Sequence, residues 1–257
     1  MLRQKRRPSR KPETWRYDRD AEDRLIAVTT PDGTCWRHLC DALSRRIAER
    51  RLTDNGVAVA EETLFTRDGD TLCERTSHAA GAQGAPESVA LAWDHAGTKP
   101  VTQVERRFLD DTEVDRCFFA IVTDLVGTPR GLVDASGDIA WHTRATLWGT
   151  TAWNRDATAY TPLRFPGQCF DPESQRHYNR HRHYDPASGR YVSPDPLGLV
   201  PASNSVSYLE NPIRWIDPLG LAGCPHRGAD KPRHSVVLGP NRPPDSPTPT
   251  GQAAHLD

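Results

Sequence analysis

The sequence has no long apolar run and almost no net charge, and these absences exclude several classes of protein. Nowhere in its 257 residues is there a stretch approaching the ~18 apolar residues of a membrane-spanning helix. No apolar segment of signal-peptide length follows the N-terminal basic run, so the chain carries no export signal of its own. Expressed alone, it is expected to stay in the cytoplasm.

Cysteine pairs spaced for a metal are also missing. The six cysteines form no CxxC pair, and we therefore predict free thiols and no cysteine-bound metal. A formal net charge of −1 gives no general attraction to nucleic acid or to an anionic membrane. The exception is the stretch from Arg3 to Arg16, where seven Lys or Arg accompany one acid, Glu13. We predict that residues 1–14 form a solvated, disordered arm and no clear nucleic-acid site.

Turn-forming residues are abundant. The chain has 22 Pro and 18 Gly, with only 36% hydrophobic residues, which favours a thin-cored β-protein over a helical one. Turn signals separate short β-rich runs, as expected of antiparallel strands in a meander. The turn signals are Pro31-Asp32-Gly33, Asp54-Asn55-Gly56, Asp68-Gly69, Gly127-Thr128-Pro129 and Ser136-Gly137-Asp138. The predicted strands include residues 25–28, 118–122, 131–133 and 139–142.

Other segments depart from this pattern. Leu43 and Ile47 lie four residues apart within residues 41–51, with Asp41 as a possible cap, so this stretch also fits a short helix. Residues 81–86 and 110–115 lose periodicity and are predicted to be loops. Seven of the last 36 residues are Pro, and we predict that the tail, residues 222–257, is disordered.

Two stretches near the N-terminus resemble YD repeats. Tyr17-Asp18 begins one unit, which continues through Pro31-Asp32-Gly33, and Cys40-Asp41 begins a second. In the second unit Cys40 replaces the usual Tyr, and Ser44 replaces the usual Gly. The resemblance implies an antiparallel YD-repeat β-sheet over residues 15–160, a partial shell.

A longer match lies further along the chain. Residues 163–172, 177–186, 189–199 and 211–221 resemble, in this order, the Rhs repeat-associated core of bacterial polymorphic toxins. In that family the YD repeats wind into a hollow β-shell around a C-terminal toxin, and the core plugs the shell and cuts the chain. The resemblance therefore implies a turn-rich core plug over residues 161–221, with residues 222–257 as the remnant of a variable toxin region.

Two Asp-Pro-Leu-Gly-Leu motifs begin at Asp195 and Asp217. If the fold brings these carboxyl groups together, one of them keeps its proton, as in aspartic proteases, and the pair supplies an acid and a base. By analogy with the family, a single-turnover cut falls between Leu221 and Ala222. Arg190 is a candidate to hold a carboxylate or the developing oxyanion.

The same motifs have a purely structural interpretation. Asp-Pro-x-Gly suits a type I turn, which makes Pro196, Gly198, Pro218 and Gly220 turn-forming residues. Asp171-Pro172 and Asp185-Pro186 are further Asp-Pro pairs to which we assign turns alone. On this interpretation the chain is an inert or adhesive YD-repeat module.

A third hypothesis, a stand-alone nuclease toxin, depends on a histidine-rich run. Taken as one strand, residues 177–184 place His177, Asn179, His181 and His183 on one face. Three imidazoles could bind zinc, but that face has no acidic ligand, and we predict neither metal nor cofactor. The leading hypothesis remains a delivery-and-release module whose partners are the N-terminal part of an Rhs shell and a cognate immunity protein. The resemblance also implies export or a cell-surface location.

Overall fold

The computed structural model describes residues 2–5, 12–80, 86–221 and 223–225. Every regular element in this part of the chain is a β-strand, and all the pairings are antiparallel. The all-β, antiparallel class predicted from the sequence is therefore confirmed. Nor do the described residues contain a helix long and apolar enough to cross a membrane.

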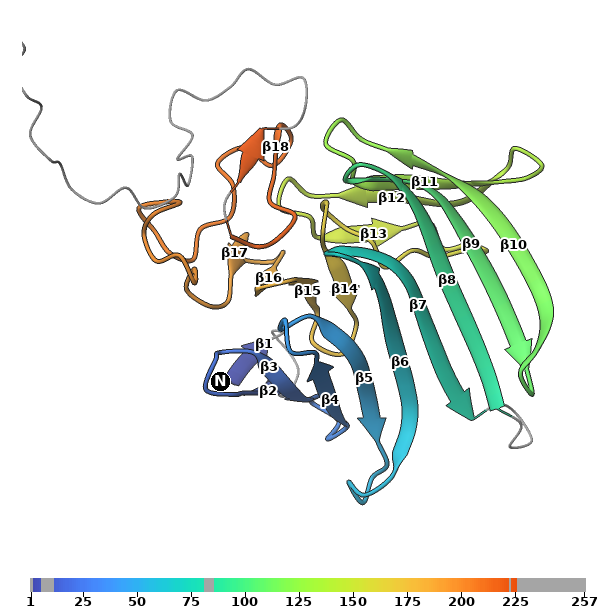
Figure 1. Ribbon diagram of the computed structural model, residues 1–257, viewed down its shortest axis with the longest axis horizontal. Helices are drawn as coiled ribbons and strands as arrows, with labels where there is room; N and C mark the ends of the chain where they lie inside the picture. Colours follow the sequence, from blue (N-terminus) through green and yellow to red (C-terminus); the bar gives the residue numbers. More distant parts are fainter. Residues whose placement is uncertain (1, 6–11, 81–85, 222, 226–257) are drawn as a thin grey trace, which may run out of the picture.

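The larger sheet has 13 strands, each paired with the next in the chain (Figure 1). The strands are β1 Leu2–Lys5, β2 Glu13–Arg19, β3 Leu25–Thr29, β4 Cys35–Cys40, β5 Arg46–Leu52, β6 Val59–Asp68, β7 Thr71–Ala80, β8 Pro86–Ala96, β9 Lys99–Leu109, β10 Thr112–Thr123, β11 Pro129–Asp134, β12 Ile139–Ala145 and β13 Thr151–Trp153. The strands predicted around residues 25, 120, 132 and 140 are all present, as β3, β10, β11 and β12.

Local turn chemistry explains why the chain reverses so regularly. Gly33, with φ 92°, lies between β3 and β4, in a backbone region that residues with a side chain rarely adopt. Before β11, Oδ1 of Asp124 accepts hydrogen bonds from the N–H groups of Val126, Gly127 and Thr128. Because each reversal is fixed by its own residues, the meander is largely determined by local sequence.

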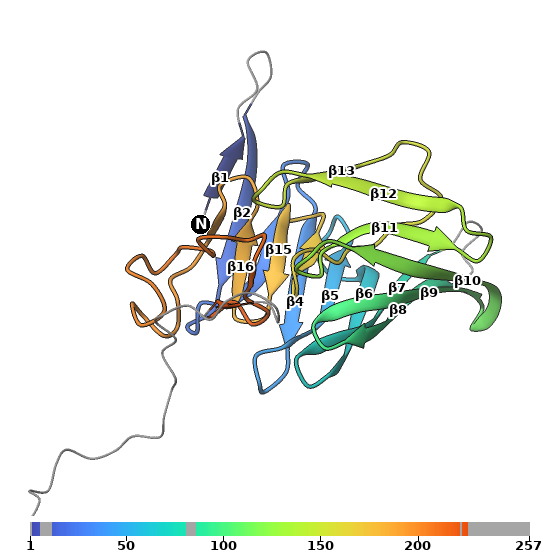
Figure 2. The same cartoon turned by 90° about the horizontal axis from the view of Figure 1, so that it is seen from above.

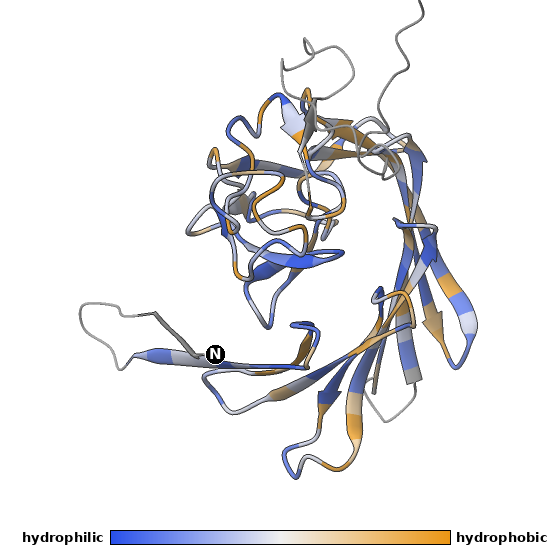
Figure 3. Ribbon diagram, turned by 60° about the vertical axis from the view of Figure 1, so that its left-hand side comes forward, coloured by the Kyte–Doolittle hydropathy of each residue, from blue (hydrophilic) through white to orange (hydrophobic). Residues whose placement is uncertain are grey.

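The large sheet curves, and the segment after β13 lies on its concave side (Figure 3). Apolar side chains from both parts form the main core: Phe65, Leu72, Trp93, Phe119, Ile121, Leu132, Ala140 and Trp141 from the sheet, and Ala159, Leu163 and Cys169 from the segment. A second cluster, Trp15, Tyr17, Leu25 and Val28, covers the N-terminal strands. Burial of these side chains holds the segment against the sheet.

We call residues 161–221 the core segment. It contains a four-stranded sheet made of β14 Cys169–Asp171, β15 Arg176–Asn179, β16 Arg182–Asp185 and β17 Arg190–Tyr191. Further along, β18 Trp215–Ile216 pairs with β19 Cys224–Pro225. Seen from above, β15 and β16 lie against the N-terminal strands of the large sheet (Figure 2). The hydroxyl group of Tyr178 in β15 accepts a hydrogen bond from the backbone N–H of Arg46 in β5.

The helix expected over residues 41–51 is wrong. Asp41 caps a turn, in which its Oδ1 accepts the N–H groups of Leu43 and Arg45, and strand β5 follows. The side chains of Leu43 and Ile47 are 60% and 42% exposed, so their spacing of four does not mark a buried helical face.

Four smaller predictions need correction or fall outside the described residues. The loop expected at residues 110–115 is a tight turn at Asp110 and Asp111, after which β10 begins at Thr112. Leu2–Lys5, expected to be disordered, forms β1 and pairs with β2. Of the loop expected at residues 81–86, Pro86 instead begins β8, and residues 81–85 lie outside the described part of the chain. In the tail expected to be disordered, Cys224–Pro225 forms β19, and residues 222 and 226–257 lie outside the described part.

Candidate functional site

The histidine-rich run is a hairpin and not one strand. β15 and β16 are joined through Arg180, whose φ is 41°, and His177 pairs with Tyr184 while Tyr178 pairs with His183. Paired residues share a face of a sheet, and faces alternate along each strand. His177 and His183 therefore lie on opposite faces, and the face of three imidazoles predicted from the sequence is wrong.

The hairpin places Arg182 at the centre of a buried polar site, with its side chain 2% exposed. Its Nη2 atom lies 2.7 Å from Oδ2 of Asp195 and 3.6 Å from Oδ2 of Asp217. The two aspartates singled out by the sequence are thus brought to the same guanidinium group. Its planar geometry and permanent charge suit it to hold two carboxylates in a fixed arrangement.

Asp195 is buried in the loop that follows β17. Burial raises the pKa of its carboxyl group above the ordinary value, and the negative charge of Asp217 acts in the same direction. The backbone N–H of Leu197 and the guanidinium group of Arg182 both act against this shift. The net direction is upward, so burial favours the protonated form of Asp195.

Asp217 is also buried, and three neighbours orient it. Its Oδ2 atom accepts a hydrogen bond of 2.7 Å from the hydroxyl group of Tyr191, and its Oδ1 atom accepts one of 2.9 Å from the N–H of Leu221. Nδ2 of Asn179 donates to the carbonyl oxygen of Asp217 and to the hydroxyl oxygen of Tyr191, each at 2.9 Å. Both carboxylate oxygens accept hydrogen bonds, as the ionised form of an aspartate does.

Arg182 also holds the backbone at the predicted cleavage position. Its Nη2 atom donates to the carbonyl oxygen of Leu221 at 2.9 Å, and its Nε atom donates to that of Gly220 at 2.5 Å. The same nitrogen therefore approaches both carboxylates and the Leu221 carbonyl group. Ala222, on the other side of this peptide bond, lies outside the described residues.

Glycines permit the close approach of the segments that carry this site. A Cβ atom on Gly220, with φ 72°, would lie 2.5 Å from the carbonyl oxygen of Asn179. A Cβ atom on Gly167, with φ 83°, would lie 2.0 Å from the carbonyl oxygen of Pro218. Neither distance is tolerated between real atoms, so both positions require glycine.

Both motifs form turns, and the backbone of the second is also held by the neighbouring hairpin. The N–H of Gly198, three residues on, donates to the Asp195 carbonyl oxygen, and Pro196 lies between them. At the second motif, the carbonyl oxygen of Leu219, between Pro218 and Gly220, accepts the N–H of His181. The turn geometry and the buried carboxylates therefore coexist, and one does not exclude the other.

The Arg190 side chain is exposed, and β17 pairs its backbone with Asp185. Among the described residues, the arginine that contacts Asp195 and Asp217 is Arg182. Sequence reasoning missed Arg182, Tyr191 and Asn179, because their roles depend on the β15–β16 hairpin and on the return of the chain after β17. The arginine nearest to a motif in sequence was a poor guide.

The other Asp-Pro pairs have separate environments. Asp185 begins a turn, in which its Oδ1 atom accepts the N–H of Ala187. Asp171 is buried and forms two hydrogen bonds, of 2.7 and 2.6 Å, with the guanidinium group of Arg46 in the large sheet. Of the four Asp-Pro aspartates, only Asp195 and Asp217 share a cationic partner in the described part of the chain.

The chain is similar to segments of much longer bacterial proteins. The Teneurin YD-shell family model matches residues 112–207. Probable deoxyribonuclease RhsA of Dickeya dadantii is 35% identical over 85% of this chain, and toxin protein Tse5 of Pseudomonas aeruginosa is 34% identical over 79% of it. The chain covers only 14% and 17% of the lengths of these two relatives.

Solved structures confirm the fold. In the crystal structure titled TcdB2-TccC3-Cdc42, a chain matches 80% of this protein with a TM-score of 0.65 and 19% identity. The chain in the Photorhabdus luminescens Tc holotoxin pore matches 85% with a TM-score of 0.64. The match spans 10% of each of those chains. At this identity, the likeness concerns the fold alone.

Proposed function

This chain belongs to the Rhs/YD-repeat family, and from that premise we propose that its core segment cuts the peptide bond after Leu221 once, by aspartyl chemistry. The chain corresponds to part of the shell region of Rhs-type toxins. In this role it closes a β-shell and releases whatever sequence follows residue 221.

One observation carries the proposal. A single buried guanidinium nitrogen of Arg182 lies 2.9 Å from the Leu221 carbonyl oxygen and 2.7 Å from the Asp195 carboxylate. A charged donor on a peptide carbonyl oxygen stabilises the negative charge that develops when a nucleophile attacks the carbon. A turn-forming role alone requires no such donor on this carbonyl group.

The proposed reaction assigns one task to each group. Asp217, ionised, takes a proton from a water molecule as its oxygen bonds to the Leu221 carbonyl carbon. Arg182 stabilises the resulting oxyanion. Asp195, protonated, donates its proton to the nitrogen of residue 222 as the carbon–nitrogen bond breaks. A new carboxyl group at Leu221 and a new amine at residue 222 account for the added water.

Intramolecular delivery explains how so small a site could suffice. The bond to be cut belongs to the same chain as the two carboxyl groups, so binding costs no translational entropy. The Leu221 N–H donates to Asp217 at 2.9 Å, which fixes the backbone next to the reacting bond. A substrate held this way needs no recognition pocket, and one turnover completes the reaction.

The structure bears on the nuclease alternative. That hypothesis depended on a histidine face at residues 177–183, but His177 and His183 lie on opposite sides of a hairpin and are both buried. His181 is exposed in the turn between them. We therefore do not retain the histidine run as a nuclease site.

The test is to express the chain and follow its mass with time. We expect a fragment ending at Leu221 and a second one starting at Ala222. Asp195→Asn and Asp217→Asn should each slow cleavage by about 10²-fold or more, because each removes a proton-transfer group. Asp185→Asn, in another Asp-Pro pair whose carboxylate caps its own turn, is the matched control and should cleave normally.

An intact chain in every preparation would reject the proposal and favour an inert or adhesive YD-repeat module. Equal cleavage in wild type and in both Asp→Asn variants would point instead to a contaminating protease.

The larger assembly follows as part of the same proposal. The 13-stranded sheet has two ends, β1 and β13, at which the remaining strands of an Rhs shell would pair. The parent protein would be exported, and a cognate immunity protein would neutralise its toxin region in the producing cell. Co-expression of the chain with the upstream shell region of a relative, followed by co-purification, tests the first of these partners.

A further inference from the structure

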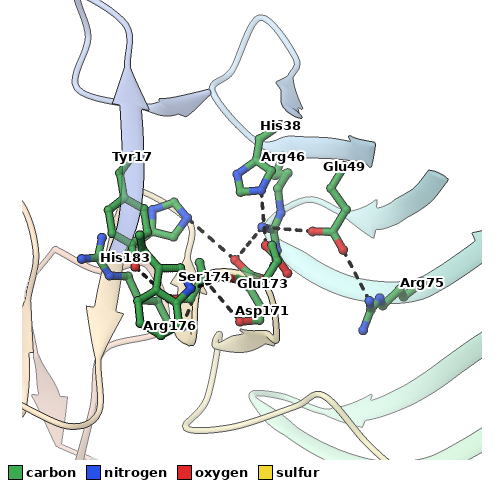
Figure 4. A network of polar contacts seen from close by, with 11 residues as sticks. Tyr17, His38, Arg46, Glu49, Arg75, Asp171, Glu173, Ser174, Arg176 and His183 are labelled. Carbon is green, nitrogen blue, oxygen red and sulfur yellow. Dashed lines mark hydrogen bonds and ion pairs between the residues drawn. The ribbon is translucent and has the colours of Figure 1, made fainter. Parts of the chain in front are cut away.

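A second buried polar cluster lies away from the Asp195–Asp217 site, where the large sheet meets the core segment (Figure 4). His38 comes from β4 and Glu49 from β5, whereas Glu173 lies between β14 and β15. One imidazole nitrogen and two carboxylate oxygens from these residues all lie within 4.8 Å of one another. The side chains of His38 and Glu173 are 1% and 3% exposed.

These atoms have ion-pair contacts but no well-formed hydrogen bonds. Among the described residues, none of good geometry reaches Nε2 of His38, Oε2 of Glu49 or Oε1 of Glu173, and the ion-pair distances are 3.3 Å from His38 to Glu173 and 3.4 Å from Arg46 to Glu49. Buried polar atoms in proteins are nearly always satisfied, so several unsatisfied atoms gathered at one point require an explanation. A cation bound between them would satisfy them together.

The distances suit a metal ion. Nε2 of His38 lies 3.3 Å from Oε1 of Glu173. Two ligands of a tetrahedral ion with bonds of about 2.0–2.1 Å are themselves about 3.3 Å apart. The Glu49 oxygen is within 4.8 Å of both atoms and supplies the third candidate ligand.

The charge balance also favours a cation. The guanidinium group of Arg46 donates two short hydrogen bonds to Asp171, and Nη2 of Arg75 lies 3.4 Å from Oε1 of Glu49. Three carboxylates thus face two guanidinium groups. The neighbouring His183 stacks on His38 with ring centroids 6.5 Å apart.

An entry path is present. A cavity of about 410 Å³, open to solvent, is lined by Glu49, Glu173 and Arg75 together with residues of the β3–β4 turn and of β4 to β6. Two of the three candidate ligands therefore border a space that an ion and its water can reach. A closed site would require partial unfolding before an ion could bind.

We propose that His38, Glu49 and Glu173 bind a divalent transition-metal ion that fastens the core segment to the sheet. An imidazole with two carboxylates suits zinc or manganese better than calcium or magnesium, which prefer oxygen ligands alone. The three ligands come from positions up to 135 residues apart in the sequence, and for this reason the sequence gave no sign of a metal site.

The experiment uses the full chain, loaded with Zn²⁺ and then separated from free metal by gel filtration. We expect about one zinc per chain by elemental mass spectrometry, falling at least about tenfold in His38→Gln and in Glu173→Gln. Glu87→Gln, an exposed glutamate in β8, is the matched control and should keep its zinc. Far-UV circular dichroism checks that each variant is folded.

A second measurement keeps the proposal testable if the variants do not fold. Wild-type chain is titrated with Co²⁺, whose visible absorption bands report a nitrogen and oxygen ligand set, and competing Zn²⁺ should remove the bands. Wild-type chain without zinc and without cobalt bands would overturn the proposal, and the pair of glutamates would then share a proton instead. Zinc retained equally by His38→Gln and Glu173→Gln would overturn it as well.

Discussion

Arg46 offers the sharpest test of how the core segment is held. Its side chain is 1% exposed and forms hydrogen bonds of 2.7 and 2.6 Å with Asp171. Its guanidinium carbon lies 4.6 Å from the ring centre of Phe65 and 4.4 Å from that of Tyr178. The residue therefore joins β5 of the sheet to β14 and β15 through charge and through ring contacts.

Replacing Arg46 with Met removes the charge but keeps much of the apolar volume. The change leaves Asp171 buried without its cation, and the loss of one partner of a buried ion pair costs about 3–5 kcal/mol. Since small domains are stable by about 5–15 kcal/mol, we expect a large fall in the free energy of unfolding, measured by urea denaturation.

Two further variants separate the charge effect from general damage. In Arg46→Met/Asp171→Asn the unpaired charge is also removed, so the double variant should lose less than the sum of the single variants, by about 1–3 kcal/mol. Arg51→Met removes an ion pair at the surface that is only partly buried, with Glu61 at 2.6 Å, and should cost less than about 1 kcal/mol. Equal losses in Arg46→Met and Arg51→Met, or strict additivity in the cycle, would refute the reasoning.

Three other predictions concern the core segment. Burial lowers the pKa of His177 well below its ordinary value of 6.5, so below that pH the unfolded chain takes up a proton that the folded chain does not. The free energy of unfolding should therefore decrease as the pH is lowered. His177 should account for about 1.4 kcal/mol of the decrease between pH 7.5 and 5.5, measured by urea denaturation, and His177→Gln should remove this contribution. Tyr191→Phe deletes the hydroxyl group that donates a hydrogen bond of 2.7 Å to Asp217. The self-cleavage rate should fall about tenfold while the circular dichroism spectrum is unchanged. A normal rate would show that this hydrogen bond has no part in the reaction. Gly167→Ala forces a Cβ atom to 2.0 Å from the carbonyl oxygen of Pro218, so self-cleavage should be lost, whereas Gly137→Ala, at a turn with open space around it, should still cleave.

Local sequence patterns predicted the strands of the large sheet well. They were misleading where the same pattern is compatible with two kinds of secondary structure. The β15–β16 hairpin turns at Arg180 and His181 without glycine or proline, so residues 177–184 looked like one continuous strand. The spacing of Leu43 and Ile47 suited a helix but belongs to a turn and a strand with exposed apolar side chains. In both places the secondary structure depends on which other residues the segment packs against, and the local sequence does not contain this information.

The sequence alone determined the fold class, because each turn of the meander is fixed by nearby residues such as Gly33 and Asp124. It also singled out Asp195 and Asp217 through a repeated motif and a family resemblance. Only the tertiary structure decided that Arg182, and not Arg190, is the cation between them. The same holds for His38, Glu49 and Glu173, since contacts between residues far apart in the sequence depend on how the core segment packs into the curved sheet.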